Sequence, residues 1–396
     1  MIAISPILTR LYTPEEFGIF ALYSSILYIS ASLSTGKYEL AILLPSGSRD
    51  SLAVVLSSLI ILSIVVSFSI LIIFIFNDEL ANLLPNENII FWLYFIPLAI
   101  LLSGVYSNFN YLSIREENYP QIARSKVEQS LGTSSLSLFF GYFNSGVFGL
   151  VFGSIFGLFL ANYSLYKKVI RPRLKEFKCV SKKEILQTTK EYINFPKHEM
   201  PASFINAVSR HMIPFLFVAN FTPILAGYYY LTQRVIGLPA NIVASAISDV
   251  FRQEAAKDFK KFNNSKDIYI STFKKLFLIG LFPSIFLFFF SKDLFILFFG
   301  PDWAVAGDYA QILTPMLFIR FISTPLSFMF VICGKQLYNL IGQTVLSIGI
   351  LCSFIIGTYF DSSILTVLFI SIFSSLFYFL YIFMSYRMAL GKSSSI

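Results

Sequence analysis

The sequence predicts an all-α protein that crosses a membrane many times. Hydrophobic residues make up 56% of the 396 residues and charged residues only 13%, whereas a soluble domain has about 25% charged residues. The mean hydropathy is +0.71. Apolar runs of about 20 residues recur along the whole chain, and each is long enough to cross a bilayer as a helix. Short alternating segments typical of a membrane β-barrel do not occur in the sequence.

Hydropathy divides the chain into eleven predicted spans, of which the fourth is short for a bilayer and needs a few more residues at its ends. Their predicted ranges are 17–36, 52–76, 89–112, 129–144, 146–166, 201–221, 223–250, 270–291, 308–333, 338–359 and 362–386.

The basic residues of the loops indicate the orientation of these spans. One set of alternate loops holds 25 of the 30 Lys and Arg residues, and the opposite set holds only Arg10 and Lys292. Cytoplasmic loops carry the excess of Lys and Arg. We therefore predict that residues 1–16 lie outside and that the tail, residues 387–396, is cytoplasmic.

A short motif occurs twice. Thr13, Pro14 and Gly18 recur 209 residues later as Thr222, Pro223 and Gly227, and both copies open a span on the predicted outer face. In each copy the proline ends one helix and the glycine lies in the first turn of the next. The match is short enough to arise by chance. Its matched place in the topology favours an internal repeat, which is common in transporters.

The repeat predicts two transmembrane lobes with pseudo-symmetry, residues 1–166 and 201–386, joined by a basic cytoplasmic linker, residues 167–200. Subtracting 209 from the span 201–221 places its partner at about −8 to 12. Met1 would then lie inside a spanning helix that is truncated at this N-terminus, and the full protein would have twelve spans, six per lobe.

Three arginines lie inside predicted spans, namely Arg210, Arg234 and Arg320. An arginine at the centre of a membrane helix costs roughly 2.5–3.5 kcal/mol on insertion scales, so these side chains should face a polar interior. Asn206 shares the helix face of Arg210, and Tyr230 and Asn241 share that of Arg234. The alternative is a structural role, in which an arginine pairs with backbone carbonyls or extends to the membrane surface.

We predict an anionic substrate in a cavity lined by these groups, because guanidinium groups bind phosphates through paired hydrogen bonds. Arg10 at the outer side and Lys37 at the inner mouth are further candidates, although Arg10 could only mark the membrane interface. The predicted substrate-binding residues are Arg210, Arg234, Arg320, Asn206, Tyr230, Asn241, Arg10 and Lys37.

Glu39 is the best-placed carboxylate for ion coupling, but a simple ion pair with Lys37 is an equally good interpretation. No Asp or Glu lies deep in a predicted span, which argues against an exporter of organic cations. His198 and His211 do not form a metal-binding pair, and the segment Gly391-Lys392-Ser393 lacks the upstream glycine of a phosphate loop. We expect no metal, no cofactor, no nucleic acid partner and no enzymatic reaction.

Four motifs resemble the polysaccharide biosynthesis and O-antigen flippases of the MATE-like multidrug/oligosaccharidyl-lipid/polysaccharide transporter superfamily. They are residues 5–18 (SPILTRLYTPEEFG), 36–45 (GKYELAILLP), 195–198 (FPKH) and 226–230 (AGYYY). The resemblance runs through nearly the whole chain, and its first two motifs are fairly specific.

The resemblance implies alternating access between two six-helix lobes. The cargo would be a polyprenyl-diphosphate-linked oligosaccharide for lipopolysaccharide O-antigen, capsule or exopolysaccharide. It would cross the cytoplasmic (inner) membrane of a bacterium, with membrane lipids and possible polymerase and glycosyltransferase partners. Two alternatives remain open: a MATE-like exporter of drugs or small cations, and a non-transporting scaffold of a polysaccharide assembly complex.

Overall fold

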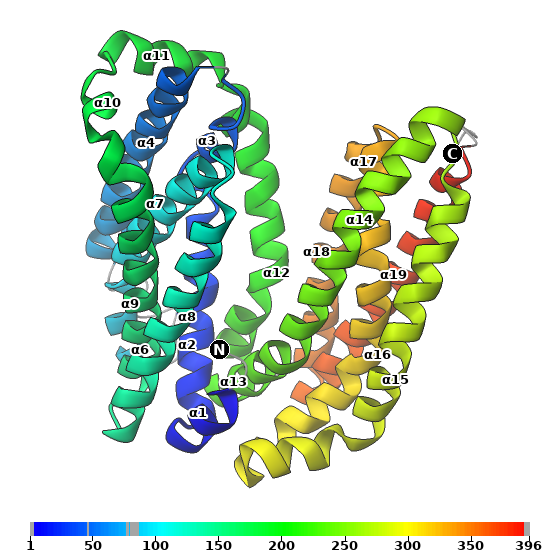
Figure 1. The fold of residues 1–396 in the computed structure, drawn as a ribbon. Helices are drawn as coiled ribbons and strands as arrows, with labels where there is room; N and C mark the ends of the chain where they lie inside the picture. The colour runs from blue at the N-terminus through cyan, green and yellow to red at the C-terminus, as the bar shows by residue number, and fades with distance from the viewer. Residues whose placement is uncertain (1–3, 46, 77–78, 80–86, 392–396) are drawn as a thin grey trace. The chain divides into compact units, whose positions relative to one another are not determined.

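The computed structural model describes residues 4–45, 47–76, 79 and 87–391, and this part of the chain contains helices and no strand (Figure 1). The prediction of an all-α protein is confirmed. Of the truncated helix predicted around Met1, residues 5–11 form α1 (Ser5–Leu11), while Met1 itself and the end of the predicted tail, residues 392–396, fall outside the described residues. The chain divides into two compact units, the first ending at Gly227 and the second beginning at Tyr228.

The first unit contains the helices up to the start of α13. They are α1 (Ser5–Leu11), α2 (Pro14–Ala31), α3 (Tyr38–Ala41), α4 (Ser48–Ile75), α6 (Glu87–Leu93), α7 (Ile96–Arg115), α8 (Tyr119–Tyr142), α9 (Val147–Leu165), η2 (Tyr166–Ile170), η3 (Arg171–Arg173), α10 (Leu174–Lys178), α11 (Lys182–Glu191), η4 (Phe195–Glu199) and α12 (Met200–Asn220). Helix α13 (Pro223–Thr232) continues into the second unit.

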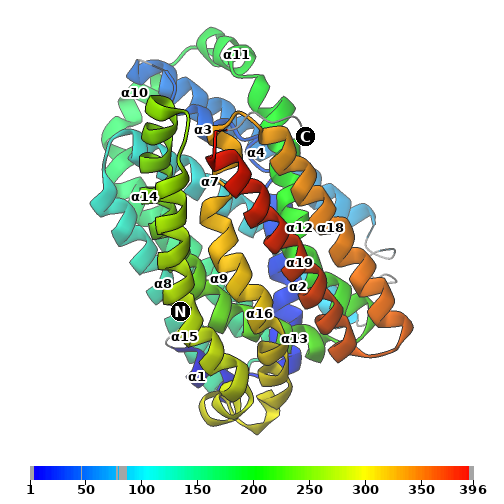
Figure 2. The same ribbon diagram turned by 90° about the vertical axis from the view of Figure 1, so that its right-hand side faces the viewer.

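The second unit contains longer helices. They are η5 (Gln233–Gly237), α14 (Leu238–Phe262), α15 (Lys266–Phe299), η6 (Pro301–Trp303), α16 (Ala304–Leu326), α17 (Met329–Ile332), α18 (Gln336–Tyr359) and α19 (Ser363–Ala389). Helix α16 packs against α15 and α19, and α19 packs against α18 (Figure 2). A buried core joins this group to α14 and α17. It includes Phe251 of α14, Leu276 of α15, Ile322 of α16 and Phe330 of α17.

Nine helical stretches among the described residues are long and apolar enough to cross a membrane. The chain is therefore a multi-pass membrane protein. Helices α2 and α8, which correspond to the predicted spans 17–36 and 129–144, are not among these nine. Helix α8 begins at Tyr119, ten residues before the predicted start, because its first turns are polar and escape a hydropathy criterion. Pro120 in the first turn and the Arg124–Glu128 ion pair at i, i+4 favour this extension.

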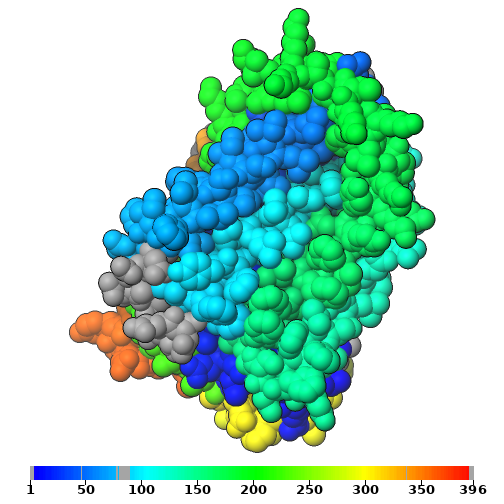
Figure 3. All heavy atoms as spheres, turned by 90° about the vertical axis from the view of Figure 1, so that its left-hand side faces the viewer, coloured from blue at the N-terminus to red at the C-terminus, as the bar shows by residue number. Residues whose placement is uncertain are grey.

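The predicted linker is helical and packed rather than extended. Ser57 of α4 lies 2.9 Å from the Thr189 hydroxyl of α11, and Arg49 at the start of α4 donates to the Cys179 carbonyl and pairs with Glu184. The linker covers one end of α4 on the face seen in Figure 3. The Ser181 backbone N–H donates to Glu184 in a capping box, which holds the pKa of Glu184 below its usual value.

Helix α12 groups with the first unit because it packs along α2. Our predicted boundary at residue 201 would have assigned this helix to the second lobe. A hydropathy pattern does not show which neighbour a helix packs against, so the sequence could not distinguish these two arrangements.

The two copies of the repeated motif contact each other within the first unit. A Cβ atom on Gly18 would lie 1.7 Å from the Pro223 carbonyl oxygen, and one on Gly227 would lie 1.9 Å from the Pro14 carbonyl oxygen. The contact is reciprocal, as the predicted repeat would produce. Only glycine permits this approach of one helix to the backbone of the other.

We expect Gly18→Ala to lower the melting temperature of the purified protein, because overpacking against a backbone carbonyl costs about 1–3 kcal/mol or more. Gly227→Ala should have a similar effect, and both can be measured by thermal unfolding in detergent. Gly237→Ala is the control, since its new Cβ would meet only the end of the Gln233 side chain, at 3.1 Å. Equal melting temperatures for Gly18→Ala and this control would contradict the tight contact.

Candidate functional site

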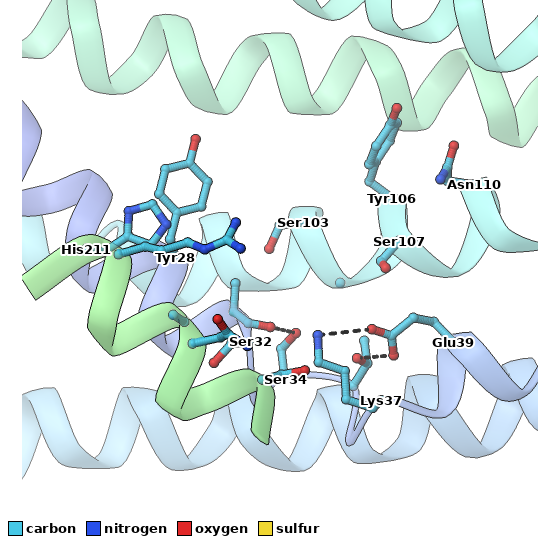
Figure 4. A pocket seen from close by; sticks show the side chains of 17 residues that line it. Tyr28, Ser32, Ser34, Lys37, Glu39, Ser103, Tyr106, Ser107, Asn110 and His211 are labelled. Carbon is cyan, nitrogen blue, oxygen red and sulfur yellow. Dashed lines mark hydrogen bonds and ion pairs between the residues drawn. The ribbon is translucent and has the colours of Figure 1, made fainter. Parts of the chain in front are cut away.

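A cavity of about 550 Å³ lies in the first unit (Figure 4). Three segments form its walls: the C-terminal end of α2 with the turn that follows, the middle of α7, and the first half of α12. Most of the lining side chains are polar. They are Tyr28, Ser32, Ser34, Thr35, Lys37 and Glu39 from the first segment, Ser103, Tyr106, Ser107 and Asn110 from α7, and Ser203, Asn206, Arg210 and His211 from α12.

The turn after α2 places two opposite charges at the cavity wall. Gly36 and Lys37 both adopt left-handed backbone conformations, with φ of 58° and 60°. Lys37 Nζ lies 3.7 Å from Glu39 Oε1, and the Thr35 hydroxyl donates to Glu39 Oε2 at 2.5 Å. Glu39 is only 4% exposed. The ion pair that the sequence suggested is therefore present, and the carboxylate has a second, neutral partner.

Tyr38 anchors this turn between the two charged residues. Its ring is buried in the core that α3 shares with α4 and α7, and its hydroxyl donates to the Thr189 carbonyl of the linker at 2.7 Å. Burial raises the pKa of Tyr38, so the hydroxyl keeps its proton at neutral pH. Through this bond the linker helps to hold Lys37 and Glu39 in place.

Arg115 at the end of α7 binds the backbone that follows α3. Its guanidinium group donates to the carbonyls of Ile42, Pro45 and Gly47, at 3.0, 2.5 and 3.3 Å. These three bonds attach Ile42, Pro45 and Gly47 to the end of α7. Arg115 is therefore a structural cation and not a part of the cavity wall.

Helix α12 supplies the second cation. Arg210 is exposed towards the cavity, with Asn206 one turn earlier on the same helix face. The next residue, His211, stacks on Tyr28 of α2 with ring centroids 4.8 Å apart and an interplanar angle of 27°. Figure 4 shows this stack at one end of the cavity and Tyr106 with Asn110 at the other.

The structure brings four of the predicted site residues together, namely Lys37, Glu39, Asn206 and Arg210. Arg10 is exposed on α1 and does not line this cavity. The remaining four candidates lie in the second unit. Arg234 is buried in η5 with Tyr230 nearby, Asn241 is exposed on α14, and Arg320 is half-buried on α16.

The prediction missed the wall contributed by α7. Ser103, Ser107 and Asn110 recur at i, i+4 and i+7 inside an apolar span, so they form a polar stripe on one helix face. This spacing could have predicted a polar face on the helix from the sequence alone. The buried Asn110 Oδ1 atom has no hydrogen-bond partner among the residues that the structure describes. Among the described residues, no group of three or more His, Cys, Asp or Glu side chains could hold a metal ion.

Comparison with known protein families shows to which family the chain belongs. The profile of the family described as "Polysaccharide biosynthesis protein" matches residues 7–308. The chain belongs to this family. The match agrees with the resemblance found in the sequence motifs. A search of curated protein sequences found no significant match.

The fold of this family member is shared by solved membrane transporters. The inward-facing conformation of a multidrug resistance MATE family transporter of the MOP superfamily matches with a TM-score of 0.76 and 14% identity, covering 100% of this chain and 96% of that chain. The lipid II flippase MurJ in its inward closed conformation matches with a TM-score of 0.74 and 14% identity, covering 98% of this chain and 85% of that chain. At these identities the likeness shows a common fold.

We expect Tyr38→Phe to loosen the linker while leaving the core packed, because the ring stays and only one hydrogen bond of about 1 kcal/mol is lost. Amide hydrogen exchange of α11 should become faster by several fold. Tyr163→Phe on α9 is the control, since that side chain is 54% exposed. Unchanged exchange in α11 would show that the Tyr38–Thr189 bond does not hold the linker.

Proposed function

We propose that this protein is a flippase that carries a polyprenyl-diphosphate-linked oligosaccharide across the bacterial cytoplasmic membrane. The cargo would be a unit of O-antigen, capsule or exopolysaccharide. Membership of the polysaccharide biosynthesis family and a transporter fold shared with the lipid II flippase support this proposal. The observation that carries it is the polar cavity of the first unit, where Lys37 and Arg210 face a space of about 550 Å³.

The charges of this cavity suit a diphosphate. A guanidinium group can donate two parallel hydrogen bonds to phosphate oxygens, so Arg210 would be the main contact. The Lys37 ammonium has three donors, and its 3.7 Å distance from Glu39 is longer than a hydrogen bond. It can therefore turn donors towards a phosphate while staying close to Glu39.

The remaining walls suit a sugar. Hydroxyl and amide groups from α2, α7 and α12 surround the cavity, and Tyr28 and Tyr106 add aromatic rings. Hydroxyl and amide side chains can both donate and accept hydrogen bonds, as sugar hydroxyls do. The buried Asn110 Oδ1 offers an acceptor that no group in the described part of the chain uses.

Glu39 would couple transport to an ion. Among the described residues of the cavity wall, Glu39 is the one acidic side chain, so a neutral carboxyl group there would leave the charge of Lys37 unopposed. The cavity would then attract a diphosphate more strongly, by Coulomb's law in a space of low dielectric constant. Release of the proton would weaken the same site.

The other predicted residues stay part of the proposal. Arg234, Arg320, Tyr230 and Asn241 would contact the cargo from the second unit at another stage of transport, and Arg10 would act at the outer side. Polysaccharide polymerase and glycosyltransferases are the partners that such a cargo implies.

An exporter of drugs or small cations is the second candidate, because MATE transporters share the fold. The cavity argues against it, since its one carboxylate is already paired with Lys37 and Thr35. An organic cation would meet Arg210 and Lys37 without a carboxylate to balance it. A non-transporting scaffold would need no charged cavity at all.

We expect Arg210→Ala and Lys37→Ala each to reduce surface glycan by about tenfold or more in cells that depend on this protein, because each loses charged hydrogen bonds worth about 1.5–3 kcal/mol. Arg210→Lys should keep part of the activity. Lys182→Ala in the linker is the charge-matched control.

Binding distinguishes the two cargo classes. Purified protein should bind polyprenyl diphosphate through the native site and lose this binding in Arg210→Ala, whereas an organic dye cation should bind both forms equally weakly. Normal glycan export by Arg210→Ala, with tight binding of the dye cation, would favour the exporter. Normal export by all three cavity variants would favour the scaffold.

We expect Glu39→Gln to keep cargo binding and to remove the response of transport to a transmembrane pH gradient, because glutamine mimics the neutral carboxyl group. The measurement is uptake into vesicles with and without an imposed gradient. Thr35→Val is the companion variant, since it removes a hydrogen-bond partner of Glu39 but leaves the carboxyl group. A Glu39→Gln protein that still follows the gradient would exclude Glu39 as the coupling residue.

A further inference from the structure

An apolar groove lies on the second unit, between the start of α15 and the end of α19. It encloses about 280 Å³. Its lining consists of aromatic and branched aliphatic side chains, namely Tyr269, Ile270 and Phe273 of α15 and Phe379, Ile382, Phe383 and Tyr386 of α19. These residues lie about 5–15 Å from the helix ends at a rise of 1.5 Å per residue. The groove therefore begins close to the membrane surface.

Hydrogen bonds hold the two walls of the groove together. The Tyr269 hydroxyl donates to the Ile382 carbonyl at 2.8 Å and lies 2.7 Å from the Ser385 hydroxyl. The Tyr269 and Tyr386 rings are in contact, with centroids 5.6 Å apart. Because α15 and α19 are joined at this crossing, the groove exists before any ligand enters, and binding needs little ordering of the protein.

Two cations lie at the membrane-surface end of this groove. Lys266 is the first residue of α15 and falls at i, i+3, i+4 and i+7 with the three α15 residues of the wall, so it shares their helix face. The Arg387 guanidinium carbon lies 4.9 Å from the centre of the Phe383 ring, which belongs to the opposite wall. Both cations are exposed.

This combination matches the shape of one kind of molecule. The groove takes an apolar chain, and the cations at its end take an anionic group attached to that chain. Both helix ends belong to the side that holds most of the loop Lys and Arg residues, which is the side that faces the cytoplasm. Basic pockets between membrane helices on this side are suited to anionic lipid headgroups.

We propose that the groove binds one anionic phospholipid of the inner leaflet. One acyl chain lies along Phe273, Phe379 and Phe383, and the phosphate lies between Lys266 and Arg387. This site is separate from the cavity with Lys37 and Arg210, and it does not depend on the proposed transport function. The lipid would join the inner ends of α15 and α19 and stabilise the second unit.

Native mass spectrometry of the full-length protein in detergent tests the site. The probes are dioleoyl phosphatidylglycerol, which is anionic, and dioleoyl phosphatidylethanolamine, which has the same chains and no net charge. We expect one phosphatidylglycerol to bind more tightly than phosphatidylethanolamine. The double variant Lys266→Ala, Arg387→Ala should lose about tenfold or more in affinity, since it removes both cations that would face the lipid phosphate.

Matched controls separate this site from general surface charge. The double variant Lys175→Ala, Lys178→Ala removes two cations from α10 and should bind phosphatidylglycerol normally, as should Arg210→Ala. Equal affinity for the two lipids, or no loss in the Lys266 and Arg387 variant, would overturn the proposal. Preferential displacement of phosphatidylglycerol by polyprenyl phosphate would also overturn it, and would assign the groove to the tail of the transported lipid.

Discussion

The cost of placing a charged side chain inside a membrane governs the first unit. A cation at membrane depth needs a polar surrounding or a paired charge, and the protein supplies both. Glu39 pairs with Lys37, the hydroxyl groups of α2 and α7 surround them, and Arg210 faces the same space from α12. The cavity therefore gives Arg210, which lies inside a predicted span, a polar surrounding, while Lys37 at the mouth of the cavity is paired with Glu39.

Hydrogen bonds also fix the backbone next to the cavity. Arg115 holds the return to α4 through three carbonyl groups, and Tyr38 connects the turn after α2 to the linker. Neither side chain lines the cavity. Their bonds keep the backbone around Lys37 and Glu39 in a conformation that includes two successive left-handed residues, which an unsupported turn would not maintain.

The sequence predicted the fold class and part of the site, for reasons that are physical. Long apolar runs and asymmetric loop charges depend only on local composition, and they identified a multi-pass helical protein. The pairing of Lys37 with Glu39 could be predicted because only Tyr38 separates the two residues in the chain. The grouping of Arg210 with these residues, and the place of α12 beside α2, depend on packing between distant segments, which no local pattern encodes. The polar residues of α7 recur with a helical period in the sequence, but that period does not show which other helices they face.

The reciprocal contact of Gly18 and Gly227 has a consequence for the history of the chain. Each glycine makes room for the backbone of the other copy, so neither position can accept a side chain while the other half stays as it is. A side chain at Gly18 would be tolerated only if the backbone around Pro223 moved, and a side chain at Gly227 only if the backbone around Pro14 moved. The two copies of the motif therefore limit each other's substitutions.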